Sequence, residues 1–209
     1  MTTVAVIGTG NMGRGLAQVL SAAGHQVVLG SRQEERAIQV ARELGEGIEG
    51  RENVEAVREA QVCFLAIPFR ENNETLRELK EQLAGKIVVD ISNPLNNAYD
   101  GLITEPTTSA AELIARALPA SRVVGAFKNT LAAIFSEPLF NGDKSTVFVV
   151  GDDQAAKDSV LKIIRSLPFV PLDAGSLSVA RTIEQMSVLL IQLVQRHQYN
   201  WRAALRVLA

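Results

Sequence analysis

Near the start of this 209-residue chain stands the stretch Val6-Ile7-Gly8-Thr9-Gly10-Asn11-Met12-Gly13-Arg14-Gly15, which decides the fold. Residues 3–7 form an apolar and largely β-branched run that predicts a buried strand. Residues 12–23 carry apolar side chains at helical spacing and predict a helix. The glycines Gly8, Gly10 and Gly13 therefore fall in a turn between a strand and a helix.

The spacing of these three glycines is typical of a turn that cradles a diphosphate. Gly8 permits the tight turn, Gly10 lets backbone N–H groups approach the phosphates, and Gly13 lets the helix pack closely on the strand. The positive N-terminus of the helix then points at the phosphates. A second predicted strand at residues 26–30 completes a βαβ unit, so we predict that the chain binds a dinucleotide. The alternative is a glycine-rich turn in an α/β domain that binds no ligand.

The residues after the second predicted strand indicate which dinucleotide is bound. NAD-binding proteins usually carry Asp or Glu there to hold the ribose 2′-hydroxyl group, whereas a cation suits a 2′-phosphate. Here Ser31 and Arg32 stand at that place, and Arg36 follows one helical turn later. Because a guanidinium group can bind phosphate with two charge-assisted hydrogen bonds, we predict NADP rather than NAD. Two structural alternatives remain: Ser31-Arg32-Gln33-Glu34 matches a capping box that opens a helix running to Leu44, and Arg36 suits a solvated helix face.

Length and composition predict one main globular domain. Hydrophobic residues make up 47% and charged residues 21% of the chain, close to the average of soluble proteins, so disorder is not expected. The net charge of −2, without a cluster of Lys and Arg, argues against nucleic-acid and membrane partners. The single cysteine, Cys63, lies in an apolar run and predicts a buried thiol in a reducing compartment. We recognise no leader before the first strand, and the apolar segment 186–194 is too short to span a bilayer, so we expect a cytoplasmic protein.

Alternating strand and helix patterns continue along the chain. They predict an α/β fold with a doubly wound, Rossmann-like, mostly parallel sheet and right-handed crossovers. A weak boundary near Asn141 divides the chain into segments 1–142 and 143–209, and the polar residues 96–107 predict a functional loop. The predicted strands are 3–7, 26–30, 48–49, 62–66, 86–90, 122–126, 146–150 and 170–172, and the predicted helices are 12–23, 32–44, 53–60, 73–83, 110–118, 154–167 and 177–196. Ser109-Ala110-Ala111-Glu112 is predicted to cap the start of the helix 110–118.

The chain offers few groups for acid, base or metal chemistry. His25 lies in a predicted turn and His197 in the polar tail, and neither has a partner at metal-ligand or triad spacing. We therefore predict no catalytic side chain and no metal site. Hydride transfer between two redox cofactors is compatible with this scarcity, because the cofactor rings carry the electronic work.

Three segments at predicted strand ends should meet at the nicotinamide end of the crevice, because the carboxyl ends of parallel strands share one edge of a sheet. These segments are Ile67-Pro68-Phe69, Ser92-Asn93-Pro94-Leu95 and Phe127-Lys128-Asn129-Thr130. Within them we predict that Pro68, Asn93, Pro94 and Lys128 contact the cofactor. The structural alternatives are that the prolines only end strands, that Phe69 is a core residue and that Lys128 is a solvated surface charge.

Over nearly its whole length the chain resembles the NADPH-dependent coenzyme F420 reductases, also called 8-hydroxy-5-deazaflavin:NADPH oxidoreductases. The features that carry the resemblance are the glycine-rich turn, Gly30-Ser31-Arg32, Ile67-Pro68, Ser109-Ala110-Ala111-Glu112, Gly151-Asp152-Asp153 and Leu172-Asp173-Ala174-Gly175-Ser176-Leu177. The resemblance implies an NADP-binding Rossmann domain in residues 1–142 and a small C-terminal α/β extension in residues 143–209. It also implies a homodimer, and a cleft in which NADPH and a deazaflavin lie face to face.

The resemblance further implies roles for individual residues. By position, Thr9, Gly10, Asn11 and Met12 contact the pyrophosphate and the nicotinamide half, Ser31, Arg32 and Arg36 contact the 2′-phosphate, and Ile67 and Pro68 contact the nicotinamide-side ribose and ring. The chain departs from the family on the deazaflavin side, where Phe127-Lys128-Asn129 stands in place of an expected histidine. A related ferric-reductase module passes hydride to a flavin from the same nucleotide motif, so FAD or FMN stays open as the acceptor.

We therefore predict an oxidoreductase that moves a hydride between NADPH and a deazaflavin of the coenzyme F420 type, with a flavin as the nearest substitute. Two other functions remain open. A reductase of a small imine or carbonyl substrate would need a proton donor near the nicotinamide, for which Lys128 and Tyr99 are the candidates. A non-catalytic module that senses the redox state of NADP would need no such donor.

Overall fold

The computed structural model describes residues 2–208, so the first and last residues of the predicted segments 1–142 and 143–209 lie outside the described range. The strands of the main sheet are β1 Thr3–Ile7, β2 Gln26–Ser31, β3 Ile48–Glu52, β4 Val62–Leu65, β5 Ile87–Asp90, β6 Arg122–Gly125, β9 Thr146–Gly151 and β10 Val170–Gly175. A small hairpin consists of β7 Leu139–Phe140 and β8 Asp143–Lys144. The helices are α1 Asn11–Ala22, α2 Glu34–Leu44, α3 Asn53–Glu59, α4 Asn72–Leu79, α5 Ala110–Ala117, α6 Ala133–Ser136, α7 Gln154–Arg165 and α8 Ala180–His197, with short 3-10 turns η1 Phe69–Glu71 and η2 Leu177–Val179.

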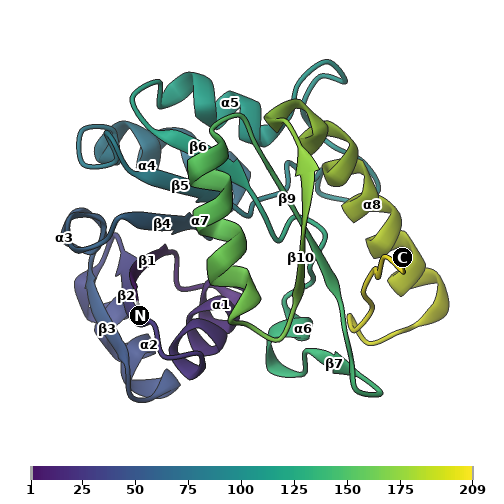
Figure 1. The fold of residues 1–209 in the computed structure, drawn as a ribbon, viewed down its shortest axis with the longest axis horizontal. Coiled ribbons are helices and arrows are strands. Elements are labelled where there is room, and N and C mark those ends of the chain that lie inside the picture. Colours follow the sequence, from purple (N-terminus) through teal and green to yellow (C-terminus); the bar gives the residue numbers. More distant parts are fainter. Residues whose placement is uncertain (1, 209) are drawn as a thin grey trace.

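The main sheet has the strand order β10-β9-β6-β5-β4-β1-β2-β3, and Figure 1 shows it running across the molecule. Strands β1 to β6 are all parallel, and their order is that of a doubly wound dinucleotide-binding sheet. Strand β9 joins β6 in the antiparallel sense, and β10 runs parallel to β9. The predicted doubly wound, mostly parallel sheet is confirmed.

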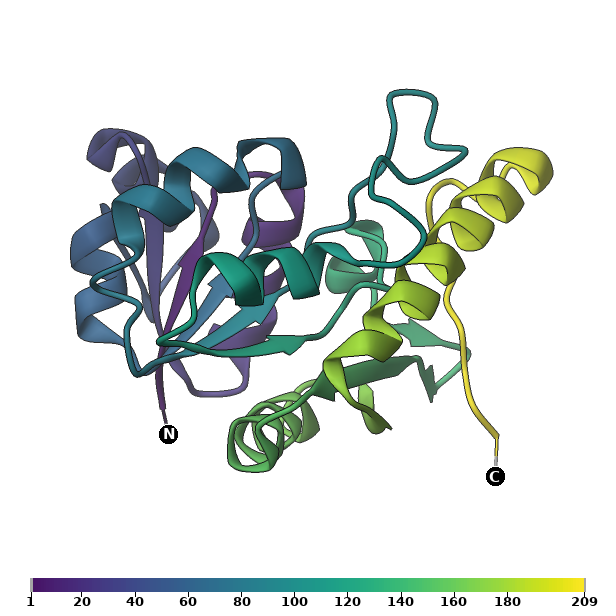
Figure 2. The same cartoon turned by 90° about the horizontal axis from the view of Figure 1, so that it is seen from above.

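Helices lie on both faces of this sheet (Figures 1 and 2), and a hydrophobic core fills the space on each face. One core receives the apolar faces of α1, α2 and α7. The other receives α3, α4, α5 and the start of α8. Strand side chains alternate between the two, so that Val4 and Val6 belong to the first core and Ala5 and Ile7 to the second. The near-continuous apolar strands of the sequence are therefore explained by helices on both faces.

The two capping boxes in the sequence behave differently. Ser109 caps α5 as predicted, because its Oγ accepts a hydrogen bond from the Glu112 amide and donates one to the Glu112 carboxylate. The predicted capping box at Ser31 is wrong. Helix α2 starts at Glu34 with Gln33 at its N-cap, and the Ser31 hydroxyl instead accepts from the Gln33 amide. Strand β2 continues through Ser31, which keeps this residue extended at the edge of the crevice.

The last helix and Cys63 each bear on an expectation from the sequence. Helix α8 and its preceding turn form a segment, Leu177–His197, of 21 residues with a mean hydropathy of 1.3. By length and composition this whole segment could cross a membrane, and the apolar residues 186–194 singled out in the sequence form only part of it. Half of its apolar window is buried inside the protein, where Ala180 and Ile183 join the core. Cys63 is buried as predicted, and burial raises the pKa of its thiol to about 12.

Candidate functional site

The glycine-rich turn after β1 is built as the sequence predicts. Gly8 has φ +121°, and a Cβ there would lie 2.4 Å from the Ala66 carbonyl oxygen. A Cβ on Gly13 would lie 1.9 Å from the Gly8 carbonyl oxygen, so only glycine lets α1 approach the turn this closely. Gly10, in contrast, has open space where a side chain would stand. The open backbone at Gly10, next to the first turn of α1, is what a diphosphate needs.

A small cavity of about 190 Å³ extends from this turn to the end of β2. Its lining residues are Gly8, Thr9, Gly10, Ser31, Arg32, Asn53, Ala66, Ile67, Pro68, Glu71 and Thr75. The structure thus brings together the predicted residues Thr9, Ser31 and Arg32. Arg36 lies on the exposed first turn of α2 and is not among the lining residues. Sequence reasoning did not select Asn53, Glu71 or Thr75, because nothing in their spacing relates them to the glycine-rich turn.

Arg32 is held loosely at the far end of the small cavity. Its side chain is 56% exposed, and its guanidinium lies 3.1 Å from a Glu71 carboxylate oxygen and 3.7 Å from one of Glu74. Ion pairs between exposed side chains contribute little to stability. A phosphate group can therefore replace these carboxylates at small cost, as the predicted binding of a 2′-phosphate requires.

A larger cavity of about 890 Å³ opens on the other side of the glycine-rich turn. Its lining residues are Gly10, Asn11, Met12, Ala66, Ile67, Pro68, Phe69, Ile91, Ser92, Asn93, Leu95, Tyr99, Lys128, Asn129, Thr130, Leu131, Ala132, Ala133, Ser187, Leu190, Ile191 and Trp201. All three predicted strand-end segments meet here. Of the residues predicted to contact the cofactor from these segments, Pro94 alone does not line the cavity. It is buried, and its carbonyl oxygen accepts a hydrogen bond from the Ile103 amide.

Part of this larger cavity could not be found from the strand ends. Ser187, Leu190 and Ile191 come from α8, and Trp201 comes from the tail that follows it. The sequence indicates a long apolar helix at this place, but no local signal shows which edge of the sheet it covers. The position of α8 follows from the strands before it, because β9 and β10 run in the opposite direction to β6.

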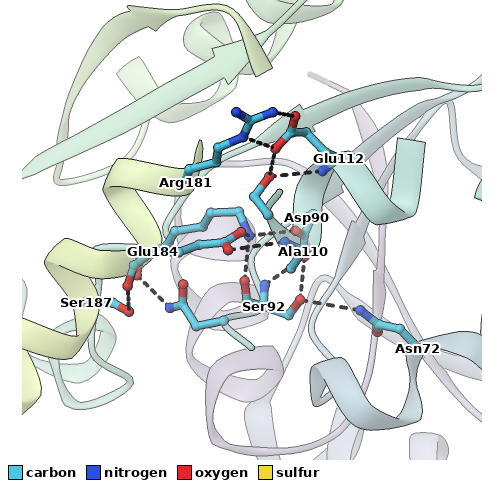
Figure 3. A network of polar contacts seen from close by, with 11 residues as sticks. Asn72, Asp90, Ser92, Ala110, Glu112, Arg181, Glu184 and Ser187 are labelled. Atoms are coloured by element: carbon cyan, nitrogen blue, oxygen red, sulfur yellow. Dashed lines mark hydrogen bonds and ion pairs between the residues drawn. The ribbon is translucent and has the colours of Figure 1, made fainter. Parts of the chain in front are cut away.

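Below the large cavity lies a buried polar cluster, which Figure 3 shows with its hydrogen bonds. The Nζ of Lys128 lies 2.6 Å from a carboxylate oxygen of Asp90, 2.6 Å from the carbonyl oxygen of Ser92 and 2.9 Å from a carboxylate oxygen of Glu184. The amide of Ala110, at the start of α5, donates to the other oxygen of Glu184. The side chains of Lys128, Asp90 and Glu184 are fully buried.

The cluster contains two carboxylates and one ammonium group, and the pKa values reflect this composition. Burial alone would lower the pKa of Lys128, but the adjacent Asp90 and Glu184 carboxylates raise it above its ordinary value. Burial raises the pKa of Glu184 above its ordinary value, although Lys128 opposes the rise. Lys128 is therefore charged, and burial among these groups favours the protonated form of Glu184 more than it would be favoured in water.

The alternative that Lys128 is a solvated surface charge is wrong, because the residue is 1% exposed. Its ammonium group donates hydrogen bonds to Asp90 and to the Ser92 carbonyl oxygen and forms an ion pair with Glu184, so it is surrounded by the protein's own oxygens. Phe69, the other residue with a structural alternative, is partly exposed at the large cavity. Within residues 2–208, no three His, Cys, Asp or Glu side chains gather as a metal site would need.

The geometry defines a class of protein: a doubly wound nucleotide-binding fold in which a phosphate-binding turn links a small polar cavity to a large apolar one. Comparisons with known proteins narrow this class. The family profile described as "NADP oxidoreductase coenzyme F420-dependent" matches residues 3–94. The F420-dependent NADP reductase of Methanocaldococcus jannaschii is 37% identical over 89% of this chain and 89% of its own length. The chain therefore belongs to the F420-dependent NADP reductase family.

Two further similarities place this family membership in context. The crystal structure of a putative F420 dependent NADP-reductase from Arthrobacter sp. FB24 superimposes with a TM-score of 0.88 at 28% identity, and each chain covers the whole of the other. Metalloreductase STEAP3 of Rattus norvegicus is 36% identical over 90% of this chain, but the chain spans only 37% of that protein. The similarity therefore extends over the full length of the Arthrobacter protein, but over only one part of the metalloreductase.

Proposed function

We propose that this protein transfers a hydride between NADPH and a deazaflavin of the coenzyme F420 type. The observation that carries the proposal is the continuity of the two cavities, which share the lining residues Gly10, Ala66, Ile67 and Pro68. One extended ligand can therefore reach from Arg32 past the glycine-rich turn to Pro68. A dinucleotide has this shape, with its diphosphate at its middle.

The residues present fit NADP at each point of that path. Gly8, Thr9, Gly10, Asn11, Met12 and Gly13 would form the turn around the diphosphate. Ser31 and Arg32, with Arg36 on the adjacent helical turn, would hold the 2′-phosphate. Ile67, Pro68, Asn93, Pro94 and Lys128 would shape the nicotinamide end, with Lys128 and Pro94 acting through buried contacts rather than by touching the ring.

The large cavity supports a second ring system as the partner of the nicotinamide. Among the described residues that line it, Lys128 alone carries a charge, and that charge is neutralised within the buried cluster. When both cofactors are bound, their rings supply the hydride chemistry, and no protein acid is required. What the chain contributes is a mainly apolar space without a free charge, in which two flat rings can be held against each other.

The test uses NADPH and oxidised F420, with both chromophores followed in one reaction. We expect equal losses of NADPH and oxidised F420. Gly10→Ala is the matched control, because its methyl group meets no protein atom within 4 Å yet occupies the approach to the diphosphate. This variant should fold normally and lose NADPH binding. A wild-type protein that binds NADPH but leaves F420 oxidised would contradict the proposal.

A flavin is the second candidate acceptor, because its isoalloxazine ring is also flat and would fit a large cavity without a free charge. Replacing F420 by FAD or FMN in the same assay compares the two directly. A small imine or carbonyl substrate is less well supported, since the Lys128 ammonium is enclosed and only Tyr99 remains as a proton donor at the cavity. A redox-sensing module would bind NADPH and NADP⁺ with different affinities and reduce neither acceptor.

We also propose a cytoplasmic homodimer with no nucleic-acid or membrane partner. The net charge of −2 and the burial of half the apolar window of α8 support this. On its outer face α8 exposes Leu189 and Leu193, which a second subunit could cover. Light scattering on the purified protein tests the dimer, and a mass of one chain, 22.6 kDa, would contradict it.

A further inference from the structure

Two large aromatic side chains stand at the large cavity and take no part in the path proposed for the dinucleotide. Tyr99 is 49% exposed and Trp201 is 47% exposed, and both line this cavity. Neither ring is paired with another aromatic ring among the described residues. Half-exposed aromatic surface at a cavity is typical of a place where a ligand binds.

The two residues come from segments that are far apart in the sequence. Tyr99 lies in the loop 96–107, and Trp201 lies in the tail after α8. Figure 2 shows this loop and the end of α8 projecting on the same side of the molecule. Gln192 of α8 donates a hydrogen bond of 3.4 Å to the Asp100 carbonyl oxygen, which ties the helix to the loop.

Both aromatic residues are held in an unusual backbone conformation. Tyr99 has φ +59° and Trp201 has φ +60°, a region that bulky side chains rarely adopt. The surroundings fix these conformations. Asn96 donates to the Asp100 carboxylate across the Tyr99 turn, and the Arg202 amide donates to the Tyr199 carbonyl oxygen across the Trp201 turn. Strained residues that the surroundings hold in place are often found at ligand sites.

The rest of the cavity wall indicates what kind of ligand would fit between these rings. Met12, Leu95, Leu190 and Ile191 supply apolar surface. The one charged lining residue, Lys128, is neutralised by Asp90 and Glu184. A small carboxylate or phosphate substrate would lose its hydration here without gaining a cation. A broad, flat and uncharged ring loses little on entry and gains contact with aromatic faces.

We propose that Tyr99 and Trp201 hold the tricyclic ring of the hydride acceptor in the large cavity and so select a fused aromatic ring over a small polar substrate. This inference rests on the proposed function, because it takes the nicotinamide to occupy the part of the cavity next to Pro68. Tyr99 acts through its ring face and not through its hydroxyl group. Neither residue lines the small cavity, where the 2′-phosphate of NADP would bind.

Trp201 is the single tryptophan of the chain and therefore reports on its own surroundings. The full-length protein is saturated with NADP⁺ and titrated with oxidised F420, and separately with FMN, while tryptophan emission is recorded. We expect a saturable loss of emission that follows acceptor binding. Trp201→Ala should weaken acceptor binding about tenfold, measured by the acceptor's own absorbance, and leave the affinity for NADP⁺ unchanged. Trp201→Phe, which keeps an aromatic ring, should stay within about threefold of wild type.

The Tyr99 variants separate ring contact from proton donation. Tyr99→Phe should bind and reduce the acceptor as wild type does, whereas Tyr99→Ala should raise the KM for the acceptor several-fold with a smaller change in kcat. Tyr199→Ala is the matched control in the tail, because Tyr199 is 50% exposed, stacks on His197 and lines a different cavity. It should leave acceptor binding unchanged.

Several outcomes would overturn the inference. They are unchanged tryptophan emission at saturating acceptor, wild-type acceptor affinity in Trp201→Ala, and equal losses in Trp201→Ala and Tyr199→Ala. If the wild-type protein reduces F420 while one of these results is obtained, the proposed function stands and only this inference fails. If the wild-type protein binds NADP⁺ but neither acceptor, the proposed function and this inference both fail.

Discussion

Two cations mark the two ends of the crevice, and the protein holds them in opposite ways. Arg32 stands in the open, 56% exposed, and lies near the exposed carboxylates of Glu71 and Glu74. Lys128 is fully enclosed, and its Nζ lies 2.6–2.9 Å from oxygens of Asp90, Ser92 and Glu184. The first cation can exchange its partners for a ligand, whereas the second cannot do so without leaving a buried charge unpaired.

A charged residue near a ligand site can therefore be either a ligand-binding group or part of the scaffold. Arg32 is suited to recognition because breaking its surface ion pairs costs little. Lys128 joins β5, the segment after β6 and α8, and thereby fixes the wall of the large cavity. The sequence motif around each residue does not separate these roles, but burial and the number of saturated donors do.

The largest effect is expected from Lys128→Met. This substitution leaves Asp90 and Glu184 buried without their cation, so we expect the free energy of unfolding to fall by about 3–5 kcal/mol. Chemical denaturation measures the loss. The exposed Lys80→Met serves as the control and should change stability by less than about 0.5 kcal/mol. Adding Glu184→Gln to Lys128→Met should recover part of the loss, because it removes one unpaired carboxylate. If Lys128→Met did not lower the free energy of unfolding, the two cations would not differ in the way described above.

Arg32→Ala tests the other end of the comparison. If Arg32 binds the 2′-phosphate, NADPH affinity should fall by roughly tenfold to a hundredfold, where each tenfold corresponds to about 1.4 kcal/mol. Stability and NADH affinity should hardly change. Calorimetric titration with both nucleotides gives the answer, and Arg42→Ala, in the helix α2 that follows Arg32, controls for a general loss of positive charge. Equal losses for NADPH and NADH would show that Arg32 does not discriminate between them.

The free energy of unfolding should depend on pH through the buried carboxyl group of Glu184. Because the pKa of this carboxyl is raised in the folded protein, its contribution is complete below its ordinary value of 4.5 and is lost as the pH rises through the folded-state pKa. Glu184→Gln removes this titration, so the difference in stability between the variant and the wild type should shift in favour of the variant as the pH rises. Denaturation curves over a series of pH values measure it. A difference that does not vary with pH would argue that Glu184 keeps its ordinary pKa.

The smallest effect is expected from Glu71→Gln. This change removes the carboxylate that lies 3.1 Å from the Arg32 guanidinium, so the cation is freer to bind phosphate. NADPH affinity should rise, but by no more than about threefold, because exposed ion pairs are worth under about 1 kcal/mol. Glu78→Gln, an exposed residue of the same helical segment, should have no effect. Weaker NADPH binding in Glu71→Gln would indicate that Glu71 itself contacts the nucleotide.

Much of the fold could be predicted from the sequence, because local patterns determine it. The bounds of β1 coincide with the prediction, and those of α1 and β2 differ from it by one residue, since strand and helix periodicities change sharply at Gly8 and Gly24. The capping prediction failed at Ser31 because strand pairing with β3 holds that residue extended. The same motif succeeded at Ser109, where no strand competes for the backbone.

The site was predictable only where it depends on one segment. The glycine-rich turn and Arg32 are local features and were found. The partners of Lys128 lie 38 residues before it and 56 residues after it in the chain, and no sequence period connects them. Trp201 follows α8, which comes after the strands β9 and β10 that run against β6, and a prediction of parallel crossovers does not include this reversal.

The antiparallel junction of β6 and β9 also has a consequence for how the crevice opens. Val124 pairs with Gly151 and Gly125 with Val150, so the wall made by the strand ends and the wall made by α8, which follows β10, are both attached to one hydrogen-bonded sheet. Such walls cannot rotate apart as two bodies about a linker, and we expect turnover to depend on local displacement of the loop 96–107 and of the tail after α8. Exchange of reactants would then be gated by a few side chains at the rim, while the cleft itself keeps a constant width.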